Sequence, residues 1–535
     1  MVDGTMSLNT YQFDQVRVRN KLARMVILHE YPLSMVDHIG FKEFVADLQP
    51  MFKLVTRNTL KSDILKIYDN KRQKALKMTD KNGSRMIITT NMWTSSNKKR
   101  GFMVITAHFI DHTWTLQSRV LRFGYVPSPH TKDVIAEVLV DCFLEWNIDR
   151  KLFTITVDNC STNDAMIKLL LNKLDTSSLM LGGSMLHMRC AAHILNLIVQ
   201  DGLSLIGDGI ERISDSVIYW TGPPKRRQKF EENALQLRVQ CTKELVLDCK
   251  TRWNSTYLML STTLIYKDVF SRLAKREISY TCLPYDYNWE LAKDICGRLE
   301  LFHNVTEFFS GRKYPTTIYP RYKMKLLEFY YPNIYGDNSD LEIEKIKNLC
   351  YDFLDEYGDI NESSVDNEES SHIPASTSSP VAQMKFRLSR AMSSFDLFVN
   401  NSSSSSKKHG SARMEFDHFI DEGVLKRSEN FDILRWWKSN GLKYPTLQRI
   451  ARDILAIPVT TIASESAFST SGRLLSTHRS RLHPKSIEAM MCAQNWLWSE
   501  INGSLTMSRD CTLQSILNDG EPNEEDGSFV TIVDD

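Results

Sequence analysis

The sequence lacks a surplus of charge of either sign. Its 535 residues include 66 Lys and Arg against 65 Asp and Glu, which leaves a formal net charge of +1 at pH 7. Proteins that bind nucleic acid through a strongly basic domain usually show an excess of Lys and Arg. Electrostatic attraction of DNA by the net charge of the whole chain is therefore excluded, and any affinity for DNA must come from local basic surfaces.

Paired cysteines and long apolar runs are missing as well. The 10 cysteines include no CxxC pair, and such scattered cysteines in a long chain fit a reducing compartment better than a disulfide framework. No segment approaches the roughly 18 uninterrupted apolar residues that a membrane span needs, and the first residues contain no apolar signal segment. We expect a soluble intracellular protein with no membrane partner.

The chain is long enough for more than one core, and its hydrophobic pattern changes along its length. At 535 residues, two or three packed units are expected. One region alternates short runs of β-branched and aromatic residues with helical patterns, in the order β-β-β-α-β-α. Its predicted strands lie at 85–90, 101–110, 116–123 and 153–157, and its predicted helices at 130–148 and 164–174. The fold class is therefore α/β plus α, with a mixed sheet, although several kinds of α/β domain share this order.

The other regions are helical or low in complexity. We expect a helical region, the α/β region, a mainly helical insertion, a compact helical end and an acidic loose tail, at residues 1–80, 81–200, 201–400, 415–500 and 501–535. The Ser- and Glu-rich stretches 361–383 and 400–412 cannot bury enough apolar surface to offset chain entropy, so we expect disorder there.

Three positions carry side chains that could serve chemistry. Asn91 and Asp158 end predicted strands, and Glu465 lies in a helical segment much later in the chain. Each signal is weak by itself, because an Asp at a strand end is more often a turn or helix N-cap residue. A Glu in a helix usually faces solvent.

The flanking segments make the pattern specific. Read in order from about residue 15 to about residue 500, they resemble landmarks of the hAT superfamily of DNA transposases, and within it of the Ricesleeper-type plant proteins. The segments are Met25-Val-Ile-Leu-His-Glu-Tyr-Pro, Ala107-His-Phe-Ile-Asp, Cys190-Ala-Ala-His, Thr251-Arg-Trp-Asn-Ser-Thr-Tyr, Phe431-Asp-Ile-Leu-Arg-Trp-Trp-Lys and Ala451-Arg-Asp-Ile-Leu-Ala-Ile-Pro. The resemblance implies a ribonuclease-H-like core interrupted by a long helical insertion, with the chain returning to the core for its last acid.

The resemblance also implies a C-terminal dimerisation region, here about 415–500. Interfaces are enriched in aromatic residues, and this region has many large apolar side chains for its length. We expect part of this surface to form a homodimer or a higher homo-oligomer. The residues concerned are Trp436, Trp437, Ile450, Ile454, Phe468 and Trp496.

In the family, the catalytic acids are Asp, Asp and Glu, and they hold Mg²⁺. Strand transfer exchanges one oxygen for another at phosphorus, and two divalent cations about 3.5–4 Å apart stabilise both oxygens. The second and third acids map on Asp158 and Glu465, but the first maps on Asn91. A neutral amide removes one charge, so the cations would repel each other with less to offset the repulsion. Mg²⁺ is therefore expected as a cofactor only if the chain is active, and Asp111 is the one substitute acid to consider.

Further residues match functional positions of the family. Trp93 and Trp253 match tryptophans that stack on DNA bases near the cut site, with a core role as the alternative. Arg252 matches an arginine near the scissile DNA. Cys190 and His193 form CxxH, but a zinc site needs three or four ligands. We therefore assign His193 to the surroundings of the active site, in contact with DNA, and Cys190 to the core.

Relatives usually begin with a zinc-binding BED finger that recognises transposon ends, and no CxxC that could form one occurs here. Three functions stay open. One is an active cut-and-paste transposase. The second is a degenerate or domesticated nuclear relative that binds DNA and dimerises without cleavage, and the retained Trp93, Arg252 and Trp253 favour it. The third is a dimerising assembly protein, or a remnant, without DNA binding, which the near-zero charge and the missing finger favour.

Overall fold

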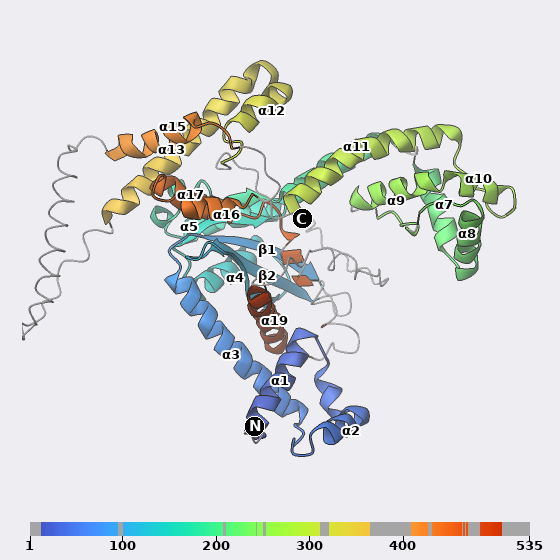
Figure 1. Cartoon of the computed structure of the whole chain (residues 1–535), viewed down its shortest axis with the longest axis horizontal. Helices are drawn as coiled ribbons and strands as arrows, with labels where there is room; N and C mark the ends of the chain where they lie inside the picture. The colour runs from blue at the N-terminus through green and yellow to red at the C-terminus, as the bar shows by residue number, and fades with distance from the viewer. Residues whose placement is uncertain are drawn as a thin grey trace, which may run out of the picture.

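The computed structural model contains a β-sheet with helices around it (Figure 1). It describes residues 12–94, 100–206, 210–241, 243–249, 253–310, 320–363, 408–425, 431–462, 464–465, 467–468, 474 and 482–505. The strands are β1 (Met86–Thr94), β2 (Gly101–Ile110), β3 (Leu116–Val126), β4 (Leu152–Val157) and β5 (His187–Arg189). The α-helices are α1 (Gln15–Leu28), α2 (Ile39–Leu48), α3 (Arg57–Lys81), α4 (Lys132–Glu145), α5 (Ser161–Lys173), α6 (Ala191–Ile206), α7 (Glu211–Thr221), α8 (Pro224–Gln236), α9 (Trp253–Ile265), α10 (Lys267–Ala274), α11 (Asp286–Ser310), α12 (Lys325–Tyr335), α13 (Ser339–Ser363), α15 (Lys408–Asp421), α16 (Ile433–Ser439), α17 (Pro445–Ile454) and α19 (Pro484–Leu505). Short 3-10 helices are η1 (Leu33–Asp37), η2 (Thr176–Ser178), η3 (Met180–Gly183) and η5 (Gly336–Asn338).

The sheet is mixed, as the sequence predicts. Its strand order is β3-β2-β1-β4-β5. β1, β2 and β3 form antiparallel pairs, whereas β4 runs parallel to both β1 and β5. The predicted fold class is confirmed. β5 was not predicted, because three residues are too few to show an alternating pattern.

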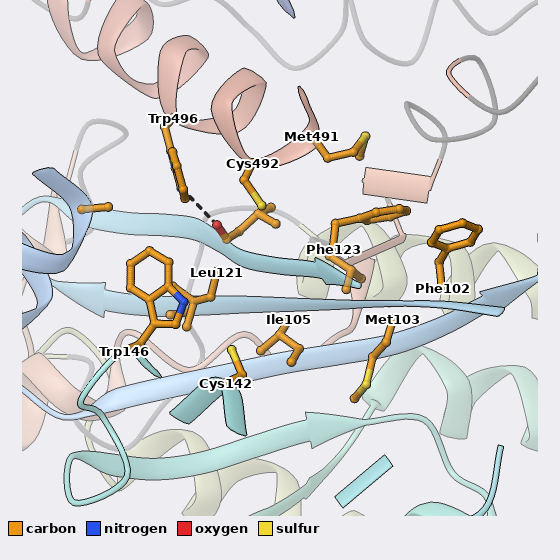
Figure 2. Close-up of a cluster of buried hydrophobic side chains, with 14 of the residues drawn as sticks. Phe102, Met103, Ile105, Leu121, Phe123, Cys142, Trp146, Met491, Cys492 and Trp496 are labelled. Atoms are coloured by element: carbon orange, nitrogen blue, oxygen red, sulfur yellow. Dashed lines mark hydrogen bonds between the residues drawn. The ribbon is translucent and has the colours of Figure 1, made fainter. Parts of the chain in front are cut away.

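α19 covers the sheet at its edge strand β3. β2 is buried along its whole length, and α19 packs against β3. Figure 2 shows Trp496 and Cys492 pointing from α19 toward the sheet. The indole N–H of Trp496 donates a hydrogen bond to the carbonyl of Val120 at 3.0 Å (Figure 2). A helix from the last part of the chain therefore completes the core of a sheet built from its first part.

The first helices form a unit that packs on α19. The carboxylate of Asp14 caps α1 by accepting hydrogen bonds from the backbone of Val16 and Arg17. Arg19 forms a two-point ion pair with Asp63, at 3.0 and 2.7 Å, and so joins α1 to α3. α3 then runs up to the sheet (Figure 1).

Helices α6 to α11 lie where we expected a mainly helical insertion. Their buried aromatic residues, among them Trp220, Phe230, Phe270 and Trp289, form a hydrophobic core separate from that of the sheet. α11 is a long helix that extends from this unit back toward the sheet (Figure 1). No helix of the described residues has both the length and the apolar character needed to cross a membrane.

A third core joins α13, α15, α16 and α17 to one end of the sheet. Trp437, Ile450, Phe468 and Trp496 are buried within the protomer, and Trp436 and Ile454 are half-buried. The third core and the sheet therefore cover most of the apolar surface at these positions, and the part that these residues play in self-association stays a prediction.

A buried carboxylate links this third core to β1. Asp453 of α17 accepts hydrogen bonds from the hydroxyl of Tyr357 in α13 and from the backbone N–H of Arg85, the latter at 2.9 Å. Burial raises the pKa of Asp453. Three segments that lie far apart in the sequence therefore meet at one acid.

The expected disordered stretches are helical where the structure describes them. α13 extends to Ser363 and α15 begins at Lys408. The rest of both stretches, within 364–407, lies outside the described residues. So does the expected loose tail beyond Leu505, which ends α19.

Candidate functional site

Neighbouring strands bring Asn91 and Asp158 together. β1 runs parallel to β4, with Thr89 opposite Thr156. Asn91 follows Thr89 by two residues, and Asp158 directly follows the end of β4. We expected Asn91 at the end of its strand, but β1 continues to Thr94 because it stays paired with β2.

The side-chain amide of Asn91 is fixed at both ends. Its Oδ1 accepts a hydrogen bond from the backbone N–H of Met92 at 2.7 Å, and its Nδ2 donates to Asp158 Oδ2 at 2.9 Å. Because a backbone N–H can only donate, the atom that faces Met92 must be the oxygen. The atom that faces Asp158 is therefore the nitrogen, which cannot bind a cation.

A threonine hydroxyl lies between the two acids. Thr461 Oγ1 is 2.8 Å from Asp158 Oδ1 and 3.0 Å from Glu465 Oε1. Since one hydroxyl contacts both carboxylates, their oxygens cannot be farther apart than these two distances placed end to end. The structure therefore brings Glu465 to Asp158, as expected from the resemblance. Sequence reasoning missed Thr461, although its position four residues before Glu465 places both on one side of a helical turn.

A buried chain of polar groups attaches the Glu465 segment to the sheet. Ser464 Oγ lies 2.9 Å from Thr89 Oγ1, which lies 2.9 Å from Nε2 of His108. Burial lowers the pKa of His108 to about 4, because a low-dielectric environment disfavours the charged ring. The neutral ring can accept the proton of Thr89, while Thr89 accepts that of Ser464.

The CxxH segment lies at the edge of the site. Cys190 is buried, as expected, but its Sγ is also 3.4 Å from Thr461 Oγ1. Burial raises the pKa of the Cys190 thiol, and its Sγ is an acceptor for the Thr461 hydroxyl. His193 follows in the first turn of α6 and is half-buried. Cys190 therefore borders the acids rather than belonging only to the core.

The two tryptophans assigned to DNA stacking are buried. Trp93 is 8% exposed and stacks on Phe468, with 6.0 Å between ring centroids. Trp253 is 3% exposed and packs edge-to-face with Phe302 in the core of the helical unit. These positions agree with the core alternative, and stacking on DNA would require both rings to leave their contacts. Arg252 lies outside the described residues.

Asp111 is not a substitute for the missing acid. β2 runs antiparallel to β1, with His108 opposite Ile87, so Asp111 follows the end of β2 that lies away from Asn91. Its Oδ1 accepts hydrogen bonds from the backbone N–H groups of Thr113 and Thr115, at 2.9 and 3.1 Å. These hydrogen bonds lower the pKa of Asp111 against the opposing effect of burial. Asp111 therefore stabilises a turn.

The residues present do not fit a pair of divalent cations. Asp158 and Glu465 are the only acids in the contacts described for this site, and no group of three or more His, Cys, Asp or Glu among the described residues is arranged to hold a metal ion. Asn159 Oδ1 is buried with no hydrogen-bond partner within the described part of the chain, but it adds a neutral oxygen without adding charge. Hard cations held close together need several carboxylates to offset their mutual repulsion.

Comparison with known families divides the chain into three matched parts. Residues 89–185 match the ZBED1 RNase-like domain, and residues 188–298 match the ZBED1 RNase-like helical domain. Residues 415–497 match the hAT family C-terminal dimerisation region. The first match begins within β1, continues past β4 and contains Asn91 and Asp158, and the last contains Glu465.

Relatives from plants align with most of the chain. Zinc finger BED domain-containing protein RICESLEEPER 2 of Oryza sativa subsp. japonica is 31% identical over 546 residues, which cover 91% of this chain and 75% of that protein. Putative AC transposase of Zea mays is 31% identical over 555 residues, covering 93% of this chain and 67% of that protein. Zinc finger BED domain-containing protein DAYSLEEPER of Arabidopsis thaliana is 29% identical over 537 residues, covering 91% and 74%.

Proposed function

Because the chain belongs to the hAT family of transposase-like proteins, we propose that it is a transposase derivative that self-associates and binds DNA without cleaving it. The match to the hAT dimerisation region supports self-association. The relation to a protein named as a putative transposase supports DNA as the partner and the nucleus as the compartment. The loss of cleavage is a separate part of the proposal and depends on Asn91.

One observation carries the proposal, which is the hydrogen bond from Asn91 Nδ2 to Asp158 Oδ2. Where the family has a carboxylate, this chain directs the positive end of an amide dipole at the second acid. A carboxylate about 4 Å from a cation contributes about 4 kcal/mol per unit of cation charge at an effective dielectric constant of about 20. Since about 1.4 kcal/mol corresponds to a tenfold change in affinity, the loss of one acid weakens cation binding by orders of magnitude.

The carboxylate of Asp158 is held by hydrogen bonds to neighbouring side chains. Asp158 accepts from Asn91 on Oδ2 and is contacted by the Thr461 hydroxyl on Oδ1. Both carboxylate oxygens therefore have partners within the protein. In this arrangement Asp158 joins β4 to the segment that carries Glu465, a structural role that needs no cation.

The first prediction compares nicking of supercoiled plasmid with Mg²⁺ or Mn²⁺ by the natural chain, the variant Asn91→Asp, and Asn91→Asp combined with Asp158→Ala. We expect no nicking by the natural chain. We expect weak cleavage without sequence preference by Asn91→Asp, because the third carboxylate restores the charge that holds cations. Combining it with Asp158→Ala should abolish that cleavage.

Thermal unfolding gives a readout that is independent of activity. Mg²⁺ should raise the Tm of Asn91→Asp and leave that of the natural chain unchanged, because a ligand stabilises only a fold that binds it. Nicking by the natural chain that disappears in Asp158→Ala would show that Asn91 does not prevent catalysis. Failure of Asn91→Asp both to bind Mg²⁺ and to nick DNA would place the defect outside position 91.

A further inference from the structure

The net charge of the chain is near zero, but its basic and acidic residues are unevenly distributed along the sequence. From Gln15 to Lys81, the span of α1 to α3, there are 14 Lys and Arg against 7 Asp and Glu, whereas the rest of the chain has 52 against 58. α1 contains no acid at all. The unit formed by the first helices is therefore basic, while the remainder is slightly acidic.

Four of the five basic residues of α3 for which no ion pair is described lie on one side of the helix, and Lys61 is the exception. Lys66, Lys74, Lys77 and Lys81 are all exposed, and we call them the lysine row. Together with the exposed Asn70, which lies between the first two, they are spaced by three or four residues, so that they follow one face of the helix. None of the four forms an ion pair with another described residue, as the ion pairs of the first helices show.

Two other basic residues of α3 form ion pairs with neighbouring helices. Lys71 forms an ion pair with Glu500 of α19, and Arg72 forms one with Glu145 of α4 at 3.3 Å. These two side chains hold α3 against the body of the protein. The lysine row is centred on a different side of the helix, because a rotation of about 100° per residue places the middle of the row about 100° from Lys71 and about 160° from Arg72.

Two basic residues of α8 in the helical unit are neutralised by comparison. In α8, Arg227 pairs with Glu244 at 2.7 Å and Lys229 pairs with Glu277 at 2.5 Å. Two of the four basic residues of α8 therefore lie beside an acid, whereas no ion pair is described for the lysine row. This contrast favours α3 over α8 as the place where an anionic partner would bind.

We infer that the lysine row is a binding surface for the phosphate backbone of duplex DNA. From Lys66 to Lys81 the helix rises about 22 Å at 1.5 Å per residue, roughly two thirds of a turn of B-form DNA. Lysine ammonium groups attract phosphates as point charges and carry no information about base sequence. The inference rests on the proposed function in taking DNA as the partner, and it assigns the contact to a helix outside the matched families.

The second prediction replaces the whole row with uncharged residues. In Lys66→Gln, Lys74→Gln, Lys77→Gln, Lys81→Gln, affinity for a fluorescent random-sequence duplex of about 30 base pairs should fall on the order of 100-fold near 0.1 M salt. The slope of log affinity against log salt concentration should become shallower by about 3 to 4, because about 0.9 counterions are released per phosphate contact. Glutamine keeps good helix propensity, and circular dichroism and the Tm will check that the fold is retained.

A matched control removes the same charge elsewhere. Lys168, Lys243, Lys275 and Lys293 are also exposed, and their change to Gln should alter affinity by less than about threefold and leave the salt slope within about one unit. An equal loss in both quadruple variants would overturn the assignment to α3, as would an unchanged slope in the row variant. A natural chain that binds no duplex, or that binds anionic vesicles instead, would contradict both this inference and DNA binding in the proposed function. Binding that survives loss of the row would contradict this inference alone.

Discussion

At the scale of single residues, the number of protons each group can donate determines the character of the site. Asn91 presents a donor to Asp158 and uses its acceptor on Met92. Thr461 has one proton for two carboxylates, and Cys190 Sγ is a third acceptor within reach of the same hydroxyl. Asp158 thus faces a donor at each oxygen, as in a structural network, rather than being left open as a ligand.

The third prediction concerns His108, which lies under this network. Its pKa is about 4 in the folded chain and about 6.5 when unfolded. Below pH 6.5 the unfolded chain takes up a proton that the folded chain does not, so stability falls between pH 6.5 and 4 and levels off below 4. The full effect is roughly 3 kcal/mol at about 1.4 kcal/mol per pKa unit.

His108→Gln keeps a group that can accept from Thr89 and removes the titration. Urea unfolding followed by tryptophan fluorescence from pH 4 to 7 should therefore show a shallower loss of stability in the variant than in the natural chain. Other acids titrate in both proteins, so the difference between the two curves is the quantity to measure. Parallel curves would contradict a buried neutral histidine.

At the scale of elements, the spacing of apolar residues predicts those helices and strands whose formation depends on their own residues. The strands β1 to β4 and the helices between them follow from alternating and helical spacing. The extension of β1 to Thr94 and the existence of β5 do not, because they depend on partner strands rather than on their own residues. In the same way Asn91, Asp158 and Glu465 could be found from motifs, whereas Thr461 and Cys190 became visible only through packing.

The fourth prediction tests the junction of α13 and α17 with β1. Tyr357→Phe removes the hydroxyl that donates to the buried Asp453 and should lower the free energy of unfolding by about 1–3 kcal/mol, because a buried acceptor loses its partner. Tyr351→Phe on the same helix is a matched control, since its hydroxyl bonds to Asp417 at the surface at 2.6 Å. It should cost less than about 1 kcal/mol. Equal effects in urea or thermal unfolding would show that the buried carboxylate does not depend on Tyr357.

At the scale of the whole molecule, the protomer is built from cores that combine distant parts of the chain. α19 completes the core of the sheet, and α17 meets α13 and β1 at Asp453. In the region that matches the hAT dimerisation family, Trp437 and Trp496 are buried inside the protomer, whereas Val424 and Leu442 remain exposed. We expect the surface that joins two copies to include exposed apolar residues of this region and of the helices packed on it.

The last prediction identifies α12 as part of that surface. α12 lies beside α13, which packs on α15 and α17 of the dimerisation region, and the α12–α13 pair extends away from the sheet (Figure 1). None of its residues is buried, although Tyr330 and Ile334, one helical turn apart, are apolar and 52% and 65% exposed. Such a surface favours a protein partner, and continuity with the dimerisation region makes a second copy of the chain the expected one.

Sedimentation across a range of protein concentrations will measure the effect of Tyr330→Glu with Ile334→Glu. Two charges placed in an apolar contact should raise the Kd of self-association on the order of 30-fold or more. Phe44→Glu with Leu48→Glu is the matched control, because these α2 residues have the same spacing and are 61% and 67% exposed. The control should leave self-association unchanged, since α2 packs on η1 of the first helical unit, whereas α12 packs on α13, which contacts α15 and α17 of the dimerisation region. Loss of self-association in the α2 pair but not in the α12 pair would move the interface to the first helices and contradict the continuity argument.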